Sequence, residues 1–311
     1  MSKKIKEYVD GDHFSSLVLV TNAAKCVTNQ GKNYYTLELR DDSGSINGKK
    51  WEITPEDEKL LVVGNILDVQ GEVNLYKNSL QLKVTMVSLP TEPVDPRMFA
   101  KKSPVPEAKL LEDYNYFYHQ IKDPELVQIV DYIINKHKDL YFVAPGGISI
   151  HHDYTNGLLH HTVSMLHHAE YFADFYGDMD KELLYAAIIL HDVDKTEEIE
   201  GNLAYKRTIE GNLLGHLSMG AAEIQEAKAM LGLDSERLIL LQHMILSHHG
   251  QPEFGSPVLP MTKEALLLHL IDNLDCDMNL ATKIVAGMNE GDFSDKVFAL
   301  DGRQLYKPHK K

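Results

Sequence analysis

Alternating apolar and polar positions mark the first 90 residues of the chain. Five segments there combine this alternation with β-branched and aromatic residues, which is typical of short β-strands. Turn-forming residues separate several of them, at 29–31, 41–44 and 77–79. Five short strands predict a small closed barrel, and the OB-fold is the five-stranded barrel best known for binding oligonucleotides. The segments are SSLVLVTNAAKCV, NYYTLELRD, SINGKKWEI, NILDVQGEVNLY and SLQLKVTMVSL, with a short helix expected over TPEDEKLL.

The periodicity becomes helical from Glu107 onward. Between the two patterns lies LPTEPVDPRMFAKKSPVP, whose five prolines disfavour helix and predict an extended linker. The expected fold class is multidomain: an all-β OB-fold barrel over residues 1–90, a linker over 91–106, an all-α helical bundle over 107–300 and a tail over 301–311. Helices are predicted over 107–121, 124–138, 158–176, 181–195, 211–231, 235–249 and 261–287.

The net charge, the N-terminal segment and the cysteines narrow the class of protein. The formal net charge of −15 argues against tight, nonspecific binding of duplex nucleic acid through a broad basic face, but it leaves room for a local basic or aromatic groove. The segment MSKKIKEYVDGDHF lacks the apolar core of a signal peptide, and no apolar run is long enough to span a bilayer. The two cysteines, Cys26 and Cys276, form no framework, so a reducing cytoplasm is the expected location.

Histidine is the unusual component, and nearly all of the 16 histidines lie between His119 and His269. The pair His191-Asp192 ends an apolar run, AAIIL, and Lys195 shares one side of the same predicted helix. The dipeptide alone is weak evidence because it occurs often by chance. It gains meaning from a series of metal-ligand residue types with one element on each successive helix: His161, His191, Asp192, His216, His248, His249 and Asp272.

This series predicts a metal-dependent phosphodiester hydrolase. Imidazole and carboxylate ligands without thiolate favour Mn, Fe, Co or Zn. A helical bundle that points them inward can hold two divalent ions about 3.5 to 4 Å apart, as many phosphoesterases do. Asp192 is expected to bridge the ions, which would activate water, and Lys195 is expected to balance charge on the phosphate.

The predicted barrel offers candidate residues for stacking bases, which tolerates any sequence because every base has a π-face. The candidates are Tyr34, Trp51 and Tyr76, with Lys50 and its neighbouring lysines to contact phosphates. For any single aromatic residue core packing is the favoured interpretation, and for each lysine the alternative is solvated surface. Tyr34 and Tyr35 point to opposite faces of a strand, so at most one of them should stack.

The H…HD…H…HH…D series resembles the HD-domain metal phosphohydrolase superfamily. Over nearly its full length the chain resembles the YhaM-type 3′→5′ exoribonucleases, an OB-fold followed by an HD domain. The resemblance implies hydrolysis of single-stranded RNA, and also of single-stranded DNA, from the 3′ end to nucleoside monophosphates, with manganese as the expected ion. Its most specific stretches are HHDYTNGLLHHTVSML, LLYAAIILHDVDK, EGNLLGHLS, ILSHHGQPEFGSP, HLIDNLDCDMN and KVFALDGRQLYKP.

The resemblance also implies roles for single residues. One metal ion would take His161, His191, Asp192 and Asp272, and the other His216, His248 and His249, with Asp192 bridging. His152 would contact substrate phosphate at the mouth of the pocket, although a polar loop is an equally open interpretation. His248 and His249 point about 100° apart on a regular helix, so one ligand and one substrate contact is an alternative assignment.

One residue departs from the family pattern. The superfamily commonly has glycine two residues after the aspartate of the HD pair, whereas this chain has Asp194. We expect Asp194 to add negative charge beside the site, which would weaken phosphate approach or alter metal preference. Nearby, His269 precedes Asp272 by three residues, so it is either an orienting partner of that carboxylate or a packing residue.

Two other functions stay open. An HD-domain phosphohydrolase of a small nucleotide or cyclic dinucleotide would share the metal series but would need no strand-binding barrel. A non-catalytic RNA-binding protein with a degraded metal site has Asp194 as its only support. Oligomers are common for helical domains of this kind, so a homo-oligomer is an open expectation, but the sequence identifies no interface.

Overall fold

The computed structural model describes residues 3–28, 30–77, 79–99, 102–148, 152–201 and 205–310, without the side chains of Pro96 and Arg97. It divides the chain into two compact units. The first consists of Met1–Lys102 with Gly201–Tyr205, and the second of Ser103–Glu200 with Lys206–Lys311. The point of division at Ser103 falls within the proline-rich stretch. Asn29 and Asn78, in two of the predicted turns, lie outside the described residues.

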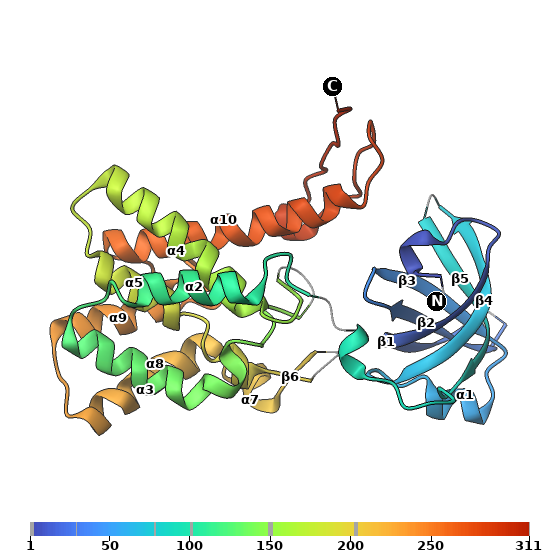
Figure 1. Cartoon of the computed structure of the whole chain (residues 1–311), viewed down its shortest axis with the longest axis horizontal. Helices are drawn as coiled ribbons and strands as arrows, with labels where there is room; N and C mark the ends of the chain where they lie inside the picture. The colour runs from blue at the N-terminus through green and yellow to red at the C-terminus, as the bar shows by residue number, and fades with distance from the viewer. Residues whose placement is uncertain are drawn as a thin grey trace. The chain divides into compact units, whose positions relative to one another are not determined.

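The first unit is a closed barrel of five strands in the order β1-β2-β3-β5-β4 (Figure 1). All neighbouring pairs are antiparallel except β3 and β5, which are parallel and close the barrel. The predicted OB-fold is therefore confirmed. The strands are β1 (His13–Val27), β2 (Asn33–Arg40), β3 (Ser45–Trp51), β4 (Ile66–Tyr76) and β5 (Ser79–Ser88).

Alternation along the strands fills the barrel with apolar side chains, among them Phe14, Leu39 and Leu82, which are fully buried. The predicted short helix is α1 (Pro55–Leu60), and its first turn is closed by reciprocal bonds between Thr54 and Asp57. The barrel bends at the irregularity between Gln70 and Gly71, where a Cβ atom would lie 2.3 Å from a backbone oxygen of β5. Only glycine fits at that bend.

The second unit is helical, as predicted. Its core is a single apolar cluster that draws on α2, α3, α4, α5, α8, α9 and α10. A two-stranded ribbon, β6 (Ile199–Glu200) and β7 (Lys206–Arg207), interrupts the helices. The helices are α2 (Glu107–Tyr118), α3 (Pro124–Tyr141), α4 (Gly157–Tyr176), α5 (Lys181–Leu190), α6 (Lys195–Glu198), α7 (Ile209–Leu213), α8 (His216–Leu231), α9 (Glu236–Ser247) and α10 (Lys263–Ala286).

Two helices differ from their predicted bounds: one ends before its predicted last residue, and the other is divided into two. The helix predicted over 181–195 stops at Leu190, because tight turn bonds follow, including one from the Val193 amide to the Leu190 carbonyl. The helix predicted over 211–231 divides at Gly215, whose φ of 73° lies in the left-handed region. No helix in the described part of the chain has the length and apolarity to cross a membrane.

Candidate metal centre

The predicted ligands lie at the ends of helices or face the middle of the bundle. His191 and Asp192 follow α5 immediately, in the turn before α6. His216 is the first residue of α8, and His248 and His249 follow the last residue of α9. His161 lies in the second turn of α4 and Asp272 in the middle of α10. The structure therefore gathers residues from five helices that span more than 100 positions of sequence.

Every one of these histidines has its Nδ1 atom fixed by an acceptor. A backbone carbonyl accepts the bond from three rings: Ile188 from His191 at 2.8 Å, Ile245 from His248 at 2.7 Å and Phe254 from His249 at 2.8 Å. A carboxylate accepts it from the other two: Asp275 from His161 at 2.7 Å and Glu198 from His216 at 2.5 Å. Such bonds orient a ring and leave Nε2 to bind a metal ion.

Asp192 lies between the two groups of histidines. Its Oδ2 atom is 3.2 Å from His191 Nε2 and 3.7 Å from His161 Nε2. Its Oδ1 atom is 3.3 Å from His216 Nε2 and 3.8 Å from His248 Nε2. The two oxygens of one carboxylate thus face different ligand sets, which is the arrangement that a bridging carboxylate needs.

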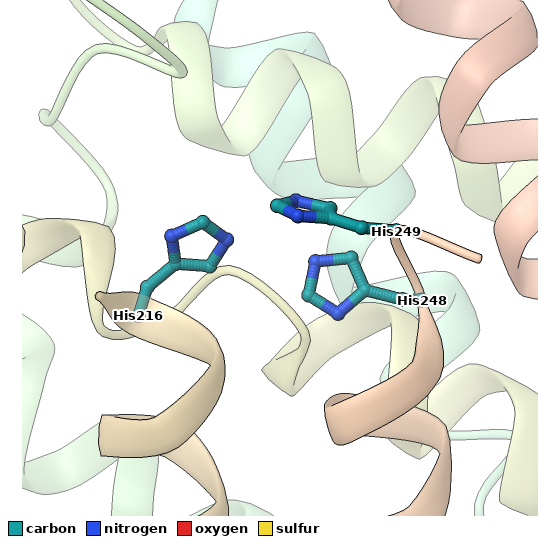
Figure 2. Close-up of side chains that lie close together, drawn as sticks. All are labelled: His216, His248 and His249. Atoms are coloured by element: carbon teal, nitrogen blue, oxygen red, sulfur yellow. The ribbon is translucent and has the colours of Figure 1, made fainter. Parts of the chain in front are cut away.

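The second group of rings consists of three histidines (Figure 2). His216, His248 and His249 point toward one another from two elements, and the ligand atoms that they offer lie within 4.8 Å of one another. His248 is buried, and this burial holds its pKa well below the usual value. Burial also lowers the pKa of His249. Both imidazoles are therefore neutral at pH 7, as metal ligands must be.

His161 sits between two carboxylates. Its Nε2 atom is 3.2 Å from Asp272 Oδ1, while Asp275 holds its Nδ1. Burial alone would lower the pKa of His161, but the bonds to Asp272 and Asp275 outweigh it and raise the pKa to about 10. A metal ion that binds at Nε2 must therefore displace a proton.

Unpartnered polar atoms test whether these residues fit a metal. Among the described residues, Asp192 Oδ1, His216 Nε2 and His248 Nε2 are buried without a hydrogen-bond partner. Buried polar atoms without a partner are costly, so such a set needs an explanation. Three such atoms around one point, two of them imidazole nitrogens and one a carboxylate oxygen, fit divalent metal ligation.

Lys195 lies against the same carboxylate, although the single helix on which we expected the two residues to lie ends at Leu190. Its Nζ atom is 2.6 Å from Asp192 Oδ2 and donates to the carbonyl of Gly146 at 2.8 Å. Burial lowers the pKa of Lys195, but the neighbouring Asp192 outweighs this effect and raises it. Although burial raises the pKa of Asp192, His191 and Lys195 hold it well below its usual value. Both side chains are therefore charged at pH 7.

His152 does not lie where we expected it. It is 1% exposed, so it is not at the mouth of a pocket. Its Nε2 atom bonds Asp275 at 2.6 Å, and its Nδ1 atom bonds the hydroxyl of Tyr154 at 2.7 Å. Its backbone φ of 45° turns the chain toward α4, where Gly157 lies so close to the His152 carbonyl that a Cβ atom would clash at 2.0 Å. The ring packs behind His161 and helps to fix Asp275.

The structure also places two neighbouring residues, Asp194 and His269. Asp194 is 5% exposed, and burial together with Glu223 raises its pKa to about 7, so it carries less negative charge at neutral pH than an exposed carboxylate would. Its carboxylate instead faces α8, 3.1 Å from the point that a Cβ atom on Gly220 would occupy. His269 does not orient Asp272 but bonds the carbonyl of His248 at 2.9 Å.

The barrel carries an aromatic group that includes three of the four predicted residues, of which Trp51 and Tyr76 are exposed and Tyr34 is half-buried. The rings of Tyr34 and Trp51 stack with centroids 4.5 Å apart, and the ammonium of Lys49 lies within 6 Å of the rings of Tyr34, Trp51 and Tyr76. We call Tyr34, Trp51, Tyr76 and Lys49 the aromatic platform. Tyr35 instead packs against the barrel core.

Lys50 was expected to contact phosphates but points the other way. It is 6% exposed, and its Nζ atom donates to the carbonyl of Thr85 at 3.1 Å and lies 3.4 Å from Asp57 Oδ2. Its charge is already compensated inside the barrel, so it is a structural residue. The prediction included both Lys49 and Lys50, but residues that follow one another in a strand face opposite sides, so only one of the two could lie beside the aromatic rings.

Sequence reasoning missed Asp275 and Glu198, the carboxylates that fix His161 and His216. Asp275 lies three residues after the predicted ligand Asp272, on the same side of α10. That spacing was a usable signal. Glu198 carried none, because nothing in the sequence pairs it with His216 eighteen residues later.

Comparisons with known proteins agree with this architecture. Residues 158–277 match the HD domain family, and residues 18–89 match the family described as OB-fold nucleic acid binding domain. Among solved structures, the chain is similar to the solution NMR structure of the second OB-fold domain of replication protein A from Methanococcus maripaludis, at 23% identity. That match covers 30% of this chain and 100% of that one, with a TM-score of 0.25.

The protein is thus an OB-fold barrel followed by a helical region that contains an HD domain. The HD domain indicates a metal-dependent phosphohydrolase, and its His and Asp clusters are suited to hold divalent metal. Together with the nucleic-acid-binding barrel, it suggests a hydrolase that acts on nucleic acid.

Proposed function

We propose that this protein is a metal-dependent 3′→5′ exoribonuclease that shortens single-stranded RNA, and also single-stranded DNA, to nucleoside monophosphates. The observation that carries the proposal is the convergence of four imidazole Nε2 atoms on Asp192, one of which also lies beside Asp272. We assign His161, His191, Asp192 and Asp272 to one ion and His216, His248 and His249 to the other, with Asp192 shared.

Two divalent ions, with manganese as the proposed pair, would activate water and stabilise negative charge on the phosphate and the leaving oxygen. The chain's own residues supply the rest. Asp192 holds its charge because His191 and Lys195 lower its pKa. Lys195 keeps its ammonium fixed between Asp192 and the Gly146 carbonyl, where it would offset charge on a bound phosphate.

A nuclease for single strands also needs to capture a flexible chain. The aromatic platform supplies flat apolar rings for bases and a cation for the backbone, a combination suited to single-stranded nucleic acid of any sequence. A tethered capture site raises the local concentration of the strand at the metal centre. The barrel therefore favours a polynucleotide substrate over a small nucleotide.

The direct test is degradation of RNA oligonucleotides labelled at either end, in the presence of Mn²⁺. A 5′ label should yield a ladder that shortens step by step, and a 3′ label should appear at once as mononucleotide. Turnover of mononucleotides or cyclic dinucleotides with intact RNA would instead favour a small-molecule phosphohydrolase. Binding of RNA with no hydrolysis of any of these substrates would favour a non-catalytic RNA-binding protein.

Replacing the shared ligand tests the assignment of the centre. Asp192→Asn should lower RNA hydrolysis by roughly 100-fold or more, because it weakens both ion sites. Asp277→Asn is the matched control, since Asp277 is an exposed carboxylate on α10. Full hydrolysis by Asp192→Asn would refute the role of the bridge.

A further inference from the structure

A second buried group of ligand-type residues lies apart from the metal centre of the HD domain, which we call the HD centre. His137 comes from α3, Asp194 from the turn after α5 and Glu223 from α8. All three are at most 5% exposed, and the ligand atoms that they offer lie within 4.8 Å of one another. The function proposed above uses none of them.

The ring of His137 is oriented in the same way as the histidines of the HD centre. Thr196 Oγ1 donates to the carbonyl of Val193 at 2.9 Å, so it accepts the bond from His137 Nδ1 at 2.7 Å. This leaves Nε2 facing Glu223, 2.8 Å from Oε2 and 3.0 Å from Oε1. Spacings of about 3 Å between donor atoms are those of neighbouring ligands on an ion with bonds of about 2.1 Å.

Asp194 is the member with an unpartnered oxygen among the described residues. Its Oδ2 atom is buried and, within the described part of the chain, has no hydrogen-bond partner. It is accommodated because residue 220 of α8 is glycine, where any side chain would crowd that oxygen. The neighbouring Lys136 pairs with Glu223 and Glu226. A buried carboxyl oxygen without a partner is costly, and a divalent ion would supply the missing partner.

We propose that His137, Asp194 and Glu223 bind an additional divalent metal ion, separate from the ions of the HD centre. One imidazole and two carboxylates suit Mn²⁺, Fe²⁺, Co²⁺ or Zn²⁺. The resembled superfamily commonly has glycine in place of Asp194, so the site does not belong to the pattern by which the HD series was found. The ion would join α3 and α8 to the turn that carries Asp192.

Metal counting on the full-length chain tests this proposal. The protein is stripped with a chelator, reloaded with Mn²⁺, freed of excess ion and assayed for manganese per chain. Asp194→Gly and Glu223→Gln should each bind about one ion fewer than the parent chain. Glu226→Gln is the matched control, because Glu226 is exposed on the same helix and also pairs with Lys136. It should bind as many ions as the parent.

Electron paramagnetic resonance supplies a second readout, because an isolated Mn²⁺ ion and a closely spaced pair give different spectra. The signal of the isolated ion should vanish in Asp194→Gly while that of the pair persists. Equal metal content and equal spectra in the parent and in Asp194→Gly would overturn the proposal and leave an ion-paired network. Should Glu223→Gln fail to fold, Asp194→Gly alone decides. Because neither readout involves RNA, failure here is distinct from failure of the proposed nuclease function.

Discussion

At the scale of single residues, the metal centre depends on the groups that hold the histidines as much as on the histidines themselves. Each Nδ1 atom has one acceptor, and the acceptors come from close by, as in Ile188 for His191, or from far away, as in Asp275 for His161. The carboxylate of Asp275 bonds three side chains, those of His152, His161 and Ser164. Asp275 is therefore the residue through which the loop before α4 is linked to the ligands.

Asp275→Asn should weaken metal binding without removing a ligand. An amide accepts fewer bonds than a carboxylate, so His161 would lose part of its orientation and basicity, and we expect metal affinity to fall roughly 10- to 100-fold. The measurement is RNA hydrolysis as a function of Mn²⁺ concentration, in which the variant should reach near-normal rates at higher metal. An unchanged Mn²⁺ dependence, matching that of the control Asp277→Asn, would contradict the role of Asp275.

The pKa of His161 predicts how stability depends on pH when metal is removed. Its folded value of about 10 lies above the usual 6.5, so protonated His161 stabilises the fold fully below about pH 6.5. This contribution is lost as pH rises toward 10. The melting temperature in chelator should therefore fall between pH 7 and 10, and His161→Gln should show a smaller fall. A metal-stripped parent whose melting temperature stays level across this window would refute the prediction.

Residue types and spacing were enough to predict which side chains gather, because metal ligation accepts few residue types. They were not enough to predict which neighbours face inward. Lys49 and Lys50 are adjacent in sequence, yet one lies over the aromatic platform and the other bonds Thr85 inside the barrel. His152 and Asp194 do lie near the centre, but the direction of His152 depends on Asp275. The direction of Asp194 depends on Glu223 and Gly220, and only the fold brings these three partners close.

At the scale of elements, helix ends rather than helix middles build most of the centre. Hydrophobic periodicity predicted the existence and type of the helices, since each buries an apolar stripe. Their ends were harder to predict, because a turn such as the one after Leu190 is set by bonds to groups outside the helix. This turn is the most important one for the metal centre, because His191 and Asp192 lie in it, directly after the end of α5 at Leu190.

The aromatic platform should bind RNA independently of the metal centre. Trp51→Ala removes one of two stacked rings and should weaken binding of single-stranded RNA about 5- to 150-fold, since a base stack is worth about 1 to 3 kcal/mol. Hydrolysis of a dinucleotide, which offers the platform almost no single strand to bind, should stay unchanged. Met86→Ala is the control, because Met86 is exposed on β5 opposite the far end of β4. Equal RNA affinity in both variants would exclude the platform as the binding surface.

At the scale of the whole molecule, the net charge of −15 and the proposed polynucleotide substrate oppose each other. Long-range repulsion would slow the approach of RNA, so capture has to rely on a small number of local cations such as Lys49 and Lys77, both of which lie over platform rings. Stacking, which does not depend on charge, would supply most of the affinity.

This balance predicts a shallow dependence of RNA binding on salt. With about two to three phosphates neutralised, the logarithm of the binding constant should fall with a slope of about −2 against the logarithm of salt concentration. Fluorescence anisotropy with an Asp192→Asn chain and a labelled oligonucleotide would measure the slope without hydrolysis. A slope steeper than about −5 would point to a broad basic surface and contradict the platform as the main contact.

The metal centre also takes one or two residues from each of five helices, so bound ions would stabilise the helical unit as well as take part in hydrolysis. An ion that binds only the folded chain stabilises it by mass action. Loss of metal would then expose the chain to proteases, since cleavage follows the population of the open form. The abundance of the protein in a cell would therefore rise and fall with the supply of free metal. Metal starvation would lower the amount of the enzyme as well as the activity of each molecule.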